Sequence, residues 1–307
     1  MKVCRRISGA NIEVIGKYIA TLNGAMENHI GYFGTDPSDI EDVLKEILED
    51  EESLIFIATG SLDAIEVAEV VLEGADEGFD MRPLLGVLVL DVDSERKWVE
   101  VMGPFSESVS DVVFTRLWEE ALNVIGEGYR YQLFFHEENV SLLRFAGRHG
   151  FSFKGNELIY EIRDYESKGH KLTLLADEDK EVFVALHNAV FPRTYYDGNE
   201  ILERVDENQQ LFVHYSEQGT LIGYVYIEAD PLMQDGSVEF VGVHADYRKQ
   251  GIGRELLGKA LEWFFVERGF TGLVTLCVNE DLKGAQNLYE AVGFERKKML
   301  LTYLREG

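Results

Sequence analysis

A short strand-like run, a basic glycine loop and an amphipathic helix, in that order, constrain this chain more than any other stretch. Residues 238–243 (VEFVGV) are rich in β-branched and aromatic side chains and are too few for a helix. The loop that follows places Gly251 and Gly253 beside cations, and a helix is predicted over 254–266. Glycine permits positive φ and close approach of a ligand, and a helix N-terminus attracts anions. The stretch predicts a phosphate-binding turn, although such glycines also occur in plain tight turns.

The spacing in this loop differs from two common nucleotide-binding motifs. A P-loop requires Gly-Lys followed by Ser or Thr, whereas Gly253 precedes Arg254, and the dinucleotide fingerprint requires a third glycine that this loop lacks. The loop instead resembles the acyl-CoA loop of the GNAT superfamily of N-acyltransferases. The superfamily pattern Gln/Arg-x-x-Gly-x-Gly/Ala is matched by Arg248, Gly251 and Gly253. A second segment, residues 285–294 (AQNLYEAVGF), is similar to the superfamily pattern Ala-x-x-Leu-Tyr-x-x-x-Gly-Phe.

Length and charge limit the remaining possibilities. The 307 residues are enough for two ordinary domains, and the formal net charge of −27 argues against nucleic acid and anionic membranes as partners, because both need clustered cations. No segment approaches the roughly 20 apolar residues of a membrane span. The first 25 residues favour an amphipathic helix over a signal peptide. Acidity could steer a cationic substrate, but it equally serves solubility.

Cysteine and histidine usage indicates neither a redox motif nor a metal site. Cys4 and Cys277 lie far apart without metal-binding or redox spacing, so we expect free thiols in a reducing cytoplasm. The seven histidines show no ligand spacing. We therefore expect a cytoplasmic protein without a metal.

The order of predicted elements in the first half is repeated in the second half. Strands are predicted over 54–58, 84–92, 97–102, 132–135, 158–162, 211–215, 221–227, 238–243, 273–278 and 298–304, and helices over 12–22, 39–48, 108–124, 141–147, 187–190, 200–205, 254–266 and 284–291. Short segments also align, namely Leu84–Gly86 with Leu221–Gly223, Val99–Val101 with Val238–Phe240, and Gly150–Phe151 with Gly293–Phe294. Chance similarity between two α/β halves is the alternative explanation.

The repeat and the resemblance together predict an α/β (α+β) protein with two GNAT-like domains. Each is expected to be a mixed, mainly antiparallel sheet flanked by helices, with a boundary in the polar stretch 164–170. Residues 170–307 are the expected catalytic domain. Residues 1–165 are the expected degenerate domain, because residues 103–108 (GPFSES) offer no cation and no second glycine where the loop should be. We expect this copy to pack against the second and to enclose its acceptor site.

The resemblance implies direct attack of an amine on the thioester of acetyl-CoA. It implies that the phenol of Tyr289, which is neutral at pH 7, protonates the departing thiolate; a half-buried helix aromatic is the alternative. Glu239 is the candidate general base for the amine, with a solvated strand carboxylate as the alternative. His244 is expected to be structural. The first copy has Phe145 where the second has Tyr289.

The resemblance also implies where the cofactor binds. Main-chain groups of Val241 and Val243 are expected to hold the pantetheine arm. In relatives, an asparagine seven residues before the tyrosine contacts the cofactor; Leu282 stands there, and Asn279 either substitutes or caps the turn. The remaining expected cofactor-binding residues form the loop and helix start: Arg248, Lys249, Gln250, Gly251, Ile252, Gly253 and Arg254.

The acceptor is the least constrained part of the prediction. Residues 191–196 (FPRTYY) lie where this fold lines its acceptor site, and their aromatics could form a hydrophobic or cation-binding wall or simple packing. We expect a monomer or homodimer that transfers the acetyl group to a primary amine of a small molecule. A protein or peptide amine, or a longer acyl group, is the alternative within the class. A non-catalytic acyl-CoA sensor or protein-interaction module is the alternative outside it.

Overall fold

The structure, a computed structural model, describes residues 5–8, 12–71, 83–107, 111–171, 173–192 and 194–307. The chain forms two compact units. The first unit comprises the residues up to Asn156 together with Met299–Gly307, and the second comprises Glu157–Lys298. In the part of the chain that is described, no helix is both long and apolar enough to cross a membrane. Cys4 lies outside the described residues, and Cys277 is a free thiol.

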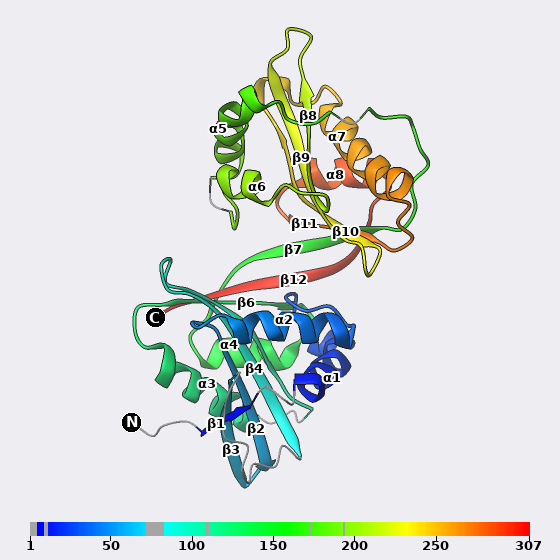
Figure 1. Cartoon of the computed structure of the whole chain (residues 1–307). Coiled ribbons are helices and arrows are strands. Elements are labelled where there is room, and N and C mark those ends of the chain that lie inside the picture. Colours follow the sequence, from blue (N-terminus) through cyan, green and yellow to red (C-terminus); the bar gives the residue numbers. More distant parts are fainter. Residues whose placement is uncertain (1–4, 9–11, 72–82, 108–110, 172, 193) are drawn as a thin grey trace. The chain divides into compact units, whose positions relative to one another are not determined.

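The first unit is built on one sheet with helices packed against it (Figure 1). Its strands follow the order β1 (Arg5–Ser8), β3 (Ala64–Val71), β2 (Leu54–Ser61), β4 (Leu84–Asp93), β5 (Trp98–Phe105), β6 (Arg130–His136) and β12 (Glu295–Glu306). All pairs are antiparallel except β1–β3 and β5–β6. The helices are α1 (Ile12–Asn23), α2 (Pro37–Glu49), α3 (Asp111–Ile125) and α4 (Val140–Arg148), with a 3₁₀ turn at Met26–Asn28.

The second unit repeats this architecture with fewer strands. Its sheet has the order β7 (Ser152–Ile162), β11 (Val274–Asn279), β10 (Asp235–Val243), β9 (Leu221–Asp230) and β8 (Gln209–Tyr215), and only β10–β11 is parallel. In Figure 1, α5 (Lys180–Val190) and α6 (Gly198–Arg204) lie on the opposite side of β8–β10 from α7 (Ile252–Leu261). The other helices are α8 (Lys283–Val292), a π-helix at Glu262–Glu267, and 3₁₀ turns at Asp177–Asp179 and Ala245–Tyr247. Both units confirm the predicted mixed, mainly antiparallel α/β class.

Local sequence accounts for several helix starts. Asp36 caps α2 by accepting the Ser38 N–H, and Pro37 occupies the first turn, where its missing N–H costs nothing. Asp197 and Glu200 form a reciprocal capping box at the start of α6. These caps satisfy N–H groups that would otherwise lack partners at the helix ends.

The compact units differ in their boundaries from the expected domains 1–165 and 170–307. The last strand, β12, pairs residue by residue with β6 from Leu300↔His136 to Glu306↔Arg130, so the chain terminus belongs to the first unit. Conversely, β7 pairs with β11 from Glu157↔Asn279 to Ile162↔Val274, which places residues 157–162 in the second unit. Long-range strand pairing, which no local pattern encodes, causes the difference.

The strand registers correct one detail of the internal alignment. When Gly86 is matched with Gly223, Leu90 matches Ile227, and their partners are Val101 and Val238. Glu100 therefore corresponds to Ser237, and the aligned segments were offset by two residues.

Two strands of the first unit, β1 and β3, were not predicted. Segment 64–71 (AIEVAEVV) alternates apolar and polar residues from Ile65 to Val67 and is enriched in β-branched side chains, a signal that favours a strand.

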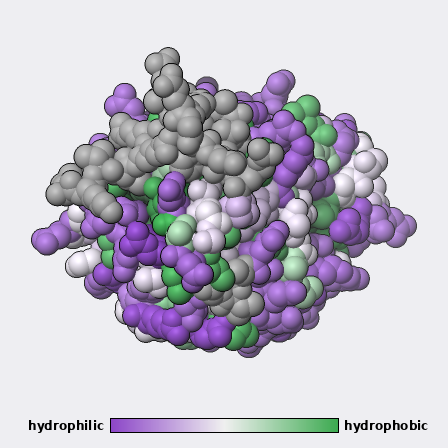
Figure 2. Space-filling view, turned by 90° about the horizontal axis from the view of Figure 1, so that it is seen from below, coloured by the Kyte–Doolittle hydropathy of each residue, from purple (hydrophilic) through white to green (hydrophobic). Residues whose placement is uncertain are grey.

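On the face of the molecule seen in Figure 2, hydrophilic side chains predominate and hydrophobic ones are scattered between them. This surface agrees with a chain in which 28% of residues are charged.

Candidate functional site

The second unit contains an opening between two strands in the middle of its sheet. β10 and β11 pair only through Gly236↔Val274 and Ser237↔Thr275, although the described strands continue to Val243 and Asn279. Beyond Ser237, the edge of β10 that faces β11 makes no strand pairing. Main-chain polar groups need partners, so this divergence leaves room for an extended ligand to pair with the strand.

The predicted glycine loop follows directly from the end of β10. Gly251 has φ of +89° and is the N-cap of α7, a conformation that side-chain-bearing residues rarely adopt. Gly253 has a different role, because a Cβ there would lie 2.9 Å from a methyl carbon of Leu288 on α8. Arg248 ties the loop to the strand, since its Nε donates to the Val243 carbonyl over 3.0 Å. The loop is thus fixed at both ends.

The cations of this loop are available to an anion. Three cationic side chains of the loop and helix start are exposed, namely Arg248, Lys249 and Arg254. None of them forms an ion pair with any described residue. Lys249 adopts a positive φ of 63°. Gln250 donates weakly to the Asp246 carbonyl over 3.4 Å. In so acidic a chain, three cations without carboxylate partners beside a helix N-terminus form a site suited to phosphate.

Glu239 lies in a β-bulge of β10. The register with β9 passes from Val238↔Ile227 to Phe240↔Tyr226, so Glu239 is the extra residue without a partner. Bulges redirect side chains and are common beside active sites. The Tyr195 hydroxyl donates a hydrogen bond to Glu239 Oε2.

Tyr289 lies on α8 and is almost entirely buried, at 8% exposure. Its ring packs against Tyr160 and Phe294, with centroids 6.1 Å and 6.2 Å away. Burial, and secondarily Cys277, raise the pKa of Tyr289 to about 12, so the phenol is neutral at physiological pH. Its hydroxyl makes no hydrogen bond to any described residue and remains free to donate.

Cys277 of β11 connects the environments of Glu239 and Tyr289. Although the residue presents part of its surface to solvent, burial of the thiol raises the pKa of Cys277 to about 12, and the charges of Glu157 and Glu239 add to the effect. Cys277 in turn contributes to the raised pKa of Tyr289. The charge of Glu239 thus acts on the Cys277 thiol, and Cys277 acts on the Tyr289 phenol. The sequence pattern had assigned no role to Cys277 or Glu157.

Two residues considered from the sequence are engaged in local structure. Asn279 donates to Glu157 over 3.0 Å and accepts the Asp281 N–H over 3.0 Å, so both ends of its amide are occupied. This is the turn-capping alternative. His244 caps a 3₁₀ turn by accepting the Asp246 N–H. The Asn279 amide keeps one further N–H and one further lone pair for another contact.

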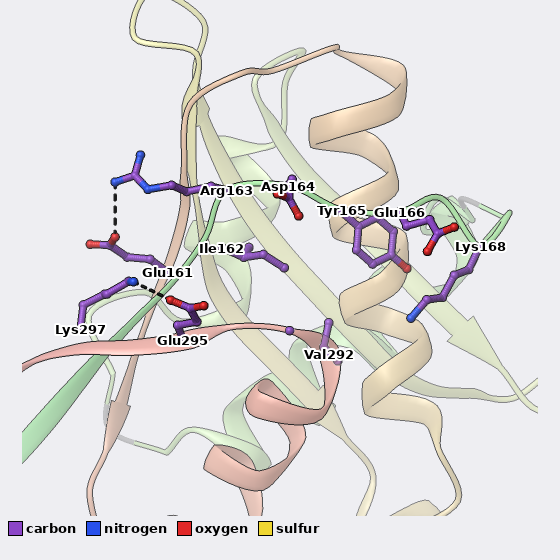
Figure 3. A pocket seen from close by; sticks show the side chains of 11 residues that line it. Glu161, Ile162, Arg163, Asp164, Tyr165, Glu166, Lys168, Val292, Glu295 and Lys297 are labelled. Carbon is purple, nitrogen blue, oxygen red and sulfur yellow. Dashed lines mark hydrogen bonds and ion pairs between the residues drawn. The ribbon is translucent and has the colours of Figure 1, made fainter.

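A pocket of about 430 Å³ in the second unit lies apart from these residues. Figure 3 shows it between the end of β7 with the chain that follows and the start of β12, with Glu161–Arg163 and Glu295–Lys297 ion pairs. It shares no residue with the predicted site. Among the described residues, no group of histidine, cysteine or carboxylate side chains has the geometry of a metal site.

Comparison with known proteins identifies the second unit. Residues 159–294 match the sequence model of the Acetyltransferase (GNAT) family. This match lies within the second unit and covers less than half of the chain. Two relatives, an acetyltransferase of Yersinia pestis (strain Pestoides F) and an uncharacterized N-acetyltransferase of Yersinia pestis, are each 28% identical over 126 residues, which is 41% of this chain and 86% of theirs.

Solved GNAT structures resemble the fold of the whole chain. A GCN5-related N-acetyltransferase from Sphaerobacter thermophilus superimposes with a TM-score of 0.70 at 18% identity, covering 99% of this chain and 95% of its own. A tandem GNAT protein from the clavulanic acid biosynthesis pathway gives a TM-score of 0.59 at 14% identity, covering 98% and 97%. At these identities the likeness concerns the GNAT fold alone.

Proposed function

We propose that the second unit binds acetyl-CoA at the β10–α7 loop and transfers the acetyl group to a primary amine of a small molecule. The observation that carries the proposal is the divergence of β10 from β11 after Ser237, next to a glycine-capped helix. Beside this helix lie three cations that form no ion pair with any described residue. An opened strand edge and an anion site, placed in succession along the chain, suit a molecule with an amide-bearing arm and phosphates.

The chain's own groups fit the two parts of acetyl-CoA. The first main-chain N–H groups of α7, at Ile252 and Gly253, have no partner within the helix and would donate hydrogen bonds to the pyrophosphate. The cations Arg248, Lys249 and Arg254 would bind the same group. The main chain of Val241 and Val243 would pair with the amides of the pantetheine arm. Gly251 keeps the approach open, because no atom lies within 4 Å of the position of an added Cβ.

Glu239 and Tyr289 divide the proton transfers. The acceptor amine is an ammonium at neutral pH, and Glu239 takes its proton. The neutral nitrogen attacks the thioester carbon, the C–S bond breaks, and the thiolate takes the proton of the Tyr289 hydroxyl. The second proton that the nitrogen loses on becoming an amide restores the Tyr289 phenol, and Glu239 releases the first to solvent. Burial keeps Tyr289 protonated until this step, since its pKa is raised to about 12. No covalent enzyme intermediate is needed.

The first unit lacks the corresponding groups and is proposed to be a degenerate GNAT-like domain. The register places no carboxylate at the position of Glu239, because Glu100 corresponds to Ser237. Phe145 of α4 is a buried core residue that packs against Trp118. At these two described positions the first unit therefore has neither a carboxylate nor a phenol.

The test is acetyl-CoA turnover with a panel of amines, using Tyr289→Phe and the matched control Tyr160→Phe. Tyr160 is also buried, but its hydroxyl already donates to Glu290 over 3.0 Å. We expect Tyr289→Phe to lower kcat by about 10²-fold with unchanged acetyl-CoA affinity, and Tyr160→Phe to have little effect on kcat. If the wild-type protein binds acetyl-CoA but acetylates no amine, it is a sensor and the proposed transfer is wrong. If Tyr289→Phe retains full turnover, Tyr289 is not the acid.

A further inference from the structure

The loop that carries Tyr195 is anchored to the sheet by a fully buried histidine. His187 of α5 has 0% exposure, its Nε2 lies 2.9 Å from the Tyr196 carbonyl oxygen, and its Nδ1 lies 2.6 Å from the Tyr224 hydroxyl. A carbonyl oxygen only accepts, so Nε2 carries the hydrogen and donates. Burial lowers the pKa of His187, so the ring is neutral and Nδ1 accepts from the Tyr224 hydroxyl. The backbone beside Tyr195 is therefore fixed relative to β9.

The ring of Tyr195 packs against the residue that follows Glu239. Its centroid lies 5.0 Å from that of Phe240 and 4.8 Å from that of Tyr196. Its hydroxyl then reaches back to Glu239 Oε2. Because the bulge projects Glu239 out of the regular pleat, the carboxylate has no strand neighbour to hold it. Tyr195 supplies the only hydrogen bond that the Glu239 carboxylate makes within the described part of the chain.

In this contact the Tyr195 hydroxyl is always the hydrogen-bond donor and Glu239 is always the acceptor. Tyr195 as a whole is 52% exposed, but the partial loss of solvent around its hydroxyl, and then the charge of Glu239, raise the pKa of Tyr195 above its usual value of 10. The phenol therefore keeps its proton and cannot itself serve as the base. A carboxylate accepts through both oxygens, so a bond to Oε2 leaves Oε1 open. A glutamate held in one rotamer avoids the entropy cost of ordering it at each turnover.

We propose that Tyr195 is a positioning residue for the acyl transfer, holding Glu239 so that Oε1 faces the acceptor ammonium. The inference rests on the proposed function, because it gives Tyr195 a role in the same proton transfer. Oε1 takes the ammonium proton, the freed nitrogen pair forms the bond to the thioester carbon, and Tyr195 exchanges no proton with either reactant. Tyr195 acts only through Glu239.

A double-mutant cycle on steady-state kinetics tests this dependence. Tyr195→Phe removes the hydroxyl and keeps the ring, and we expect kcat to fall about 10-fold while KM for acetyl-CoA is unchanged. In a Glu239→Gln background, the same change should produce no further fall. If the two losses multiply, Tyr195 acts independently of Glu239 and the inference is overturned. Tyr215→Phe is the matched control, because the Tyr215 hydroxyl also donates to a carboxylate, that of Asp179 over 2.8 Å, outside the candidate site, and its kcat should equal that of the wild type.

A second measurement examines the contact without turnover. In protein labelled with ¹³Cζ-tyrosine, the Tyr195 signal is assigned by its loss in Tyr195→Phe. We expect Glu239→Gln to shift this signal, and Glu228→Gln to shift instead the signal of Tyr226, which donates to Glu228 over 2.8 Å. If Glu239→Gln leaves the chemical shift of Tyr195 unchanged, the inference is overturned and the proposed function still stands. A responsive signal in a protein that acetylates no amine would refute the proposed function, and the positioning role with it.

Discussion

Ser237 of β10 lies opposite Thr275 of β11, and this is the last pairing along the described lengths of the two strands. Six further residues of β10 follow before the strand ends at Val243. After the opening comes the loop in which the Arg248 Nε donates a hydrogen bond to the Val243 carbonyl. One strand thus connects the bulged Glu239, the exposed strand edge and the basic loop, which is why a single element organises the candidate site.

Gly251→Ala tests the backbone requirement of the loop. The φ of +89° imposes strain on any residue with a Cβ, and no neighbouring atom within 4 Å adds a clash. We expect the free energy of unfolding to fall by about 1 kcal/mol and acetyl-CoA affinity to fall as the loop relaxes. Calorimetric titration and urea unfolding measure the two effects.

The control is Gly269→Ala, which changes a glycine with a φ of +66° and equally open surroundings, outside the predicted site. It should cost similar stability and leave acetyl-CoA affinity unchanged. Equal affinities for the Gly251 and Gly269 variants would show that the loop backbone does not shape the cofactor site.

Glu262→Gln tests a buried carboxylate that fixes the segment after β7. Glu262 is 5% exposed, and it accepts the main-chain N–H groups of Lys168, Gly169 and His170 over 2.6–3.4 Å together with the Ser167 hydroxyl. Burial alone would raise the pKa of Glu262, but these hydrogen bonds outweigh it and lower the pKa below 4.5. A lowered pKa contributes stability above the unfolded value, which is lost as the pH falls through the folded value.

We expect Glu262→Gln to reduce the free energy of unfolding at pH 7 by about 1–3 kcal/mol. The difference from wild type should shrink as the pH falls below 4.5. Urea unfolding at pH 7 and at acidic pH measures it, with the exposed Glu267→Gln as a control that should match wild type. A constant difference at all pH values would contradict the role of the charge.

Glu100→Gln tests a carboxylate of the first unit. Glu100 lies directly opposite Asp91. Burial, and then the Asp91 charge, raise the pKa of Glu100 from 4.5 to about 7. Between these values the folded state binds more protons than the unfolded state, so stability falls as the pH rises from 4.5 to 7.

Glutamine cannot ionise, so Glu100→Gln should be more stable than wild type at pH 8 by about 2 kcal/mol and nearly equal to it at pH 4. Thermal unfolding across this range measures the difference. The exposed Glu95→Gln should follow wild type. Parallel stability curves for wild type and Glu100→Gln would contradict the buried-charge account.

The sequence predicted elements better than it predicted their long-range pairing. The strand over 238–243 and the helices after it were confirmed as β10, α7 and α8 within a few residues, because apolar periodicity and glycine punctuation are local signals. The pairing of β12 with β6 depends on residues about 170 positions apart along the chain, and no periodicity encodes it. The domain boundaries consequently differed from the compact units.

The candidate site shows the same division between local and non-local signals. The loop from Arg248 to Arg254 was predicted because glycines and cations lie together in sequence. The bond from Tyr195 to Glu239 joins residues 44 positions apart and depends on a bulge, so only the segment 191–196 could be singled out beforehand. The roles of Glu239 and Tyr289 stay predictions, which the mutants above address.

Isothermal titration with acetyl-CoA tests the central claim most directly. Wild type, Arg254→Glu in the loop helix and Arg144→Glu on α4 of the first unit would be compared at one ionic strength, because phosphate contacts are screened by salt. We predict wild-type binding, a loss of at least about 10-fold in affinity for Arg254→Glu, and no change for Arg144→Glu. Absence of binding by the folded wild type, or equal binding by Arg254→Glu, would contradict the placement of acetyl-CoA at the β10–α7 loop.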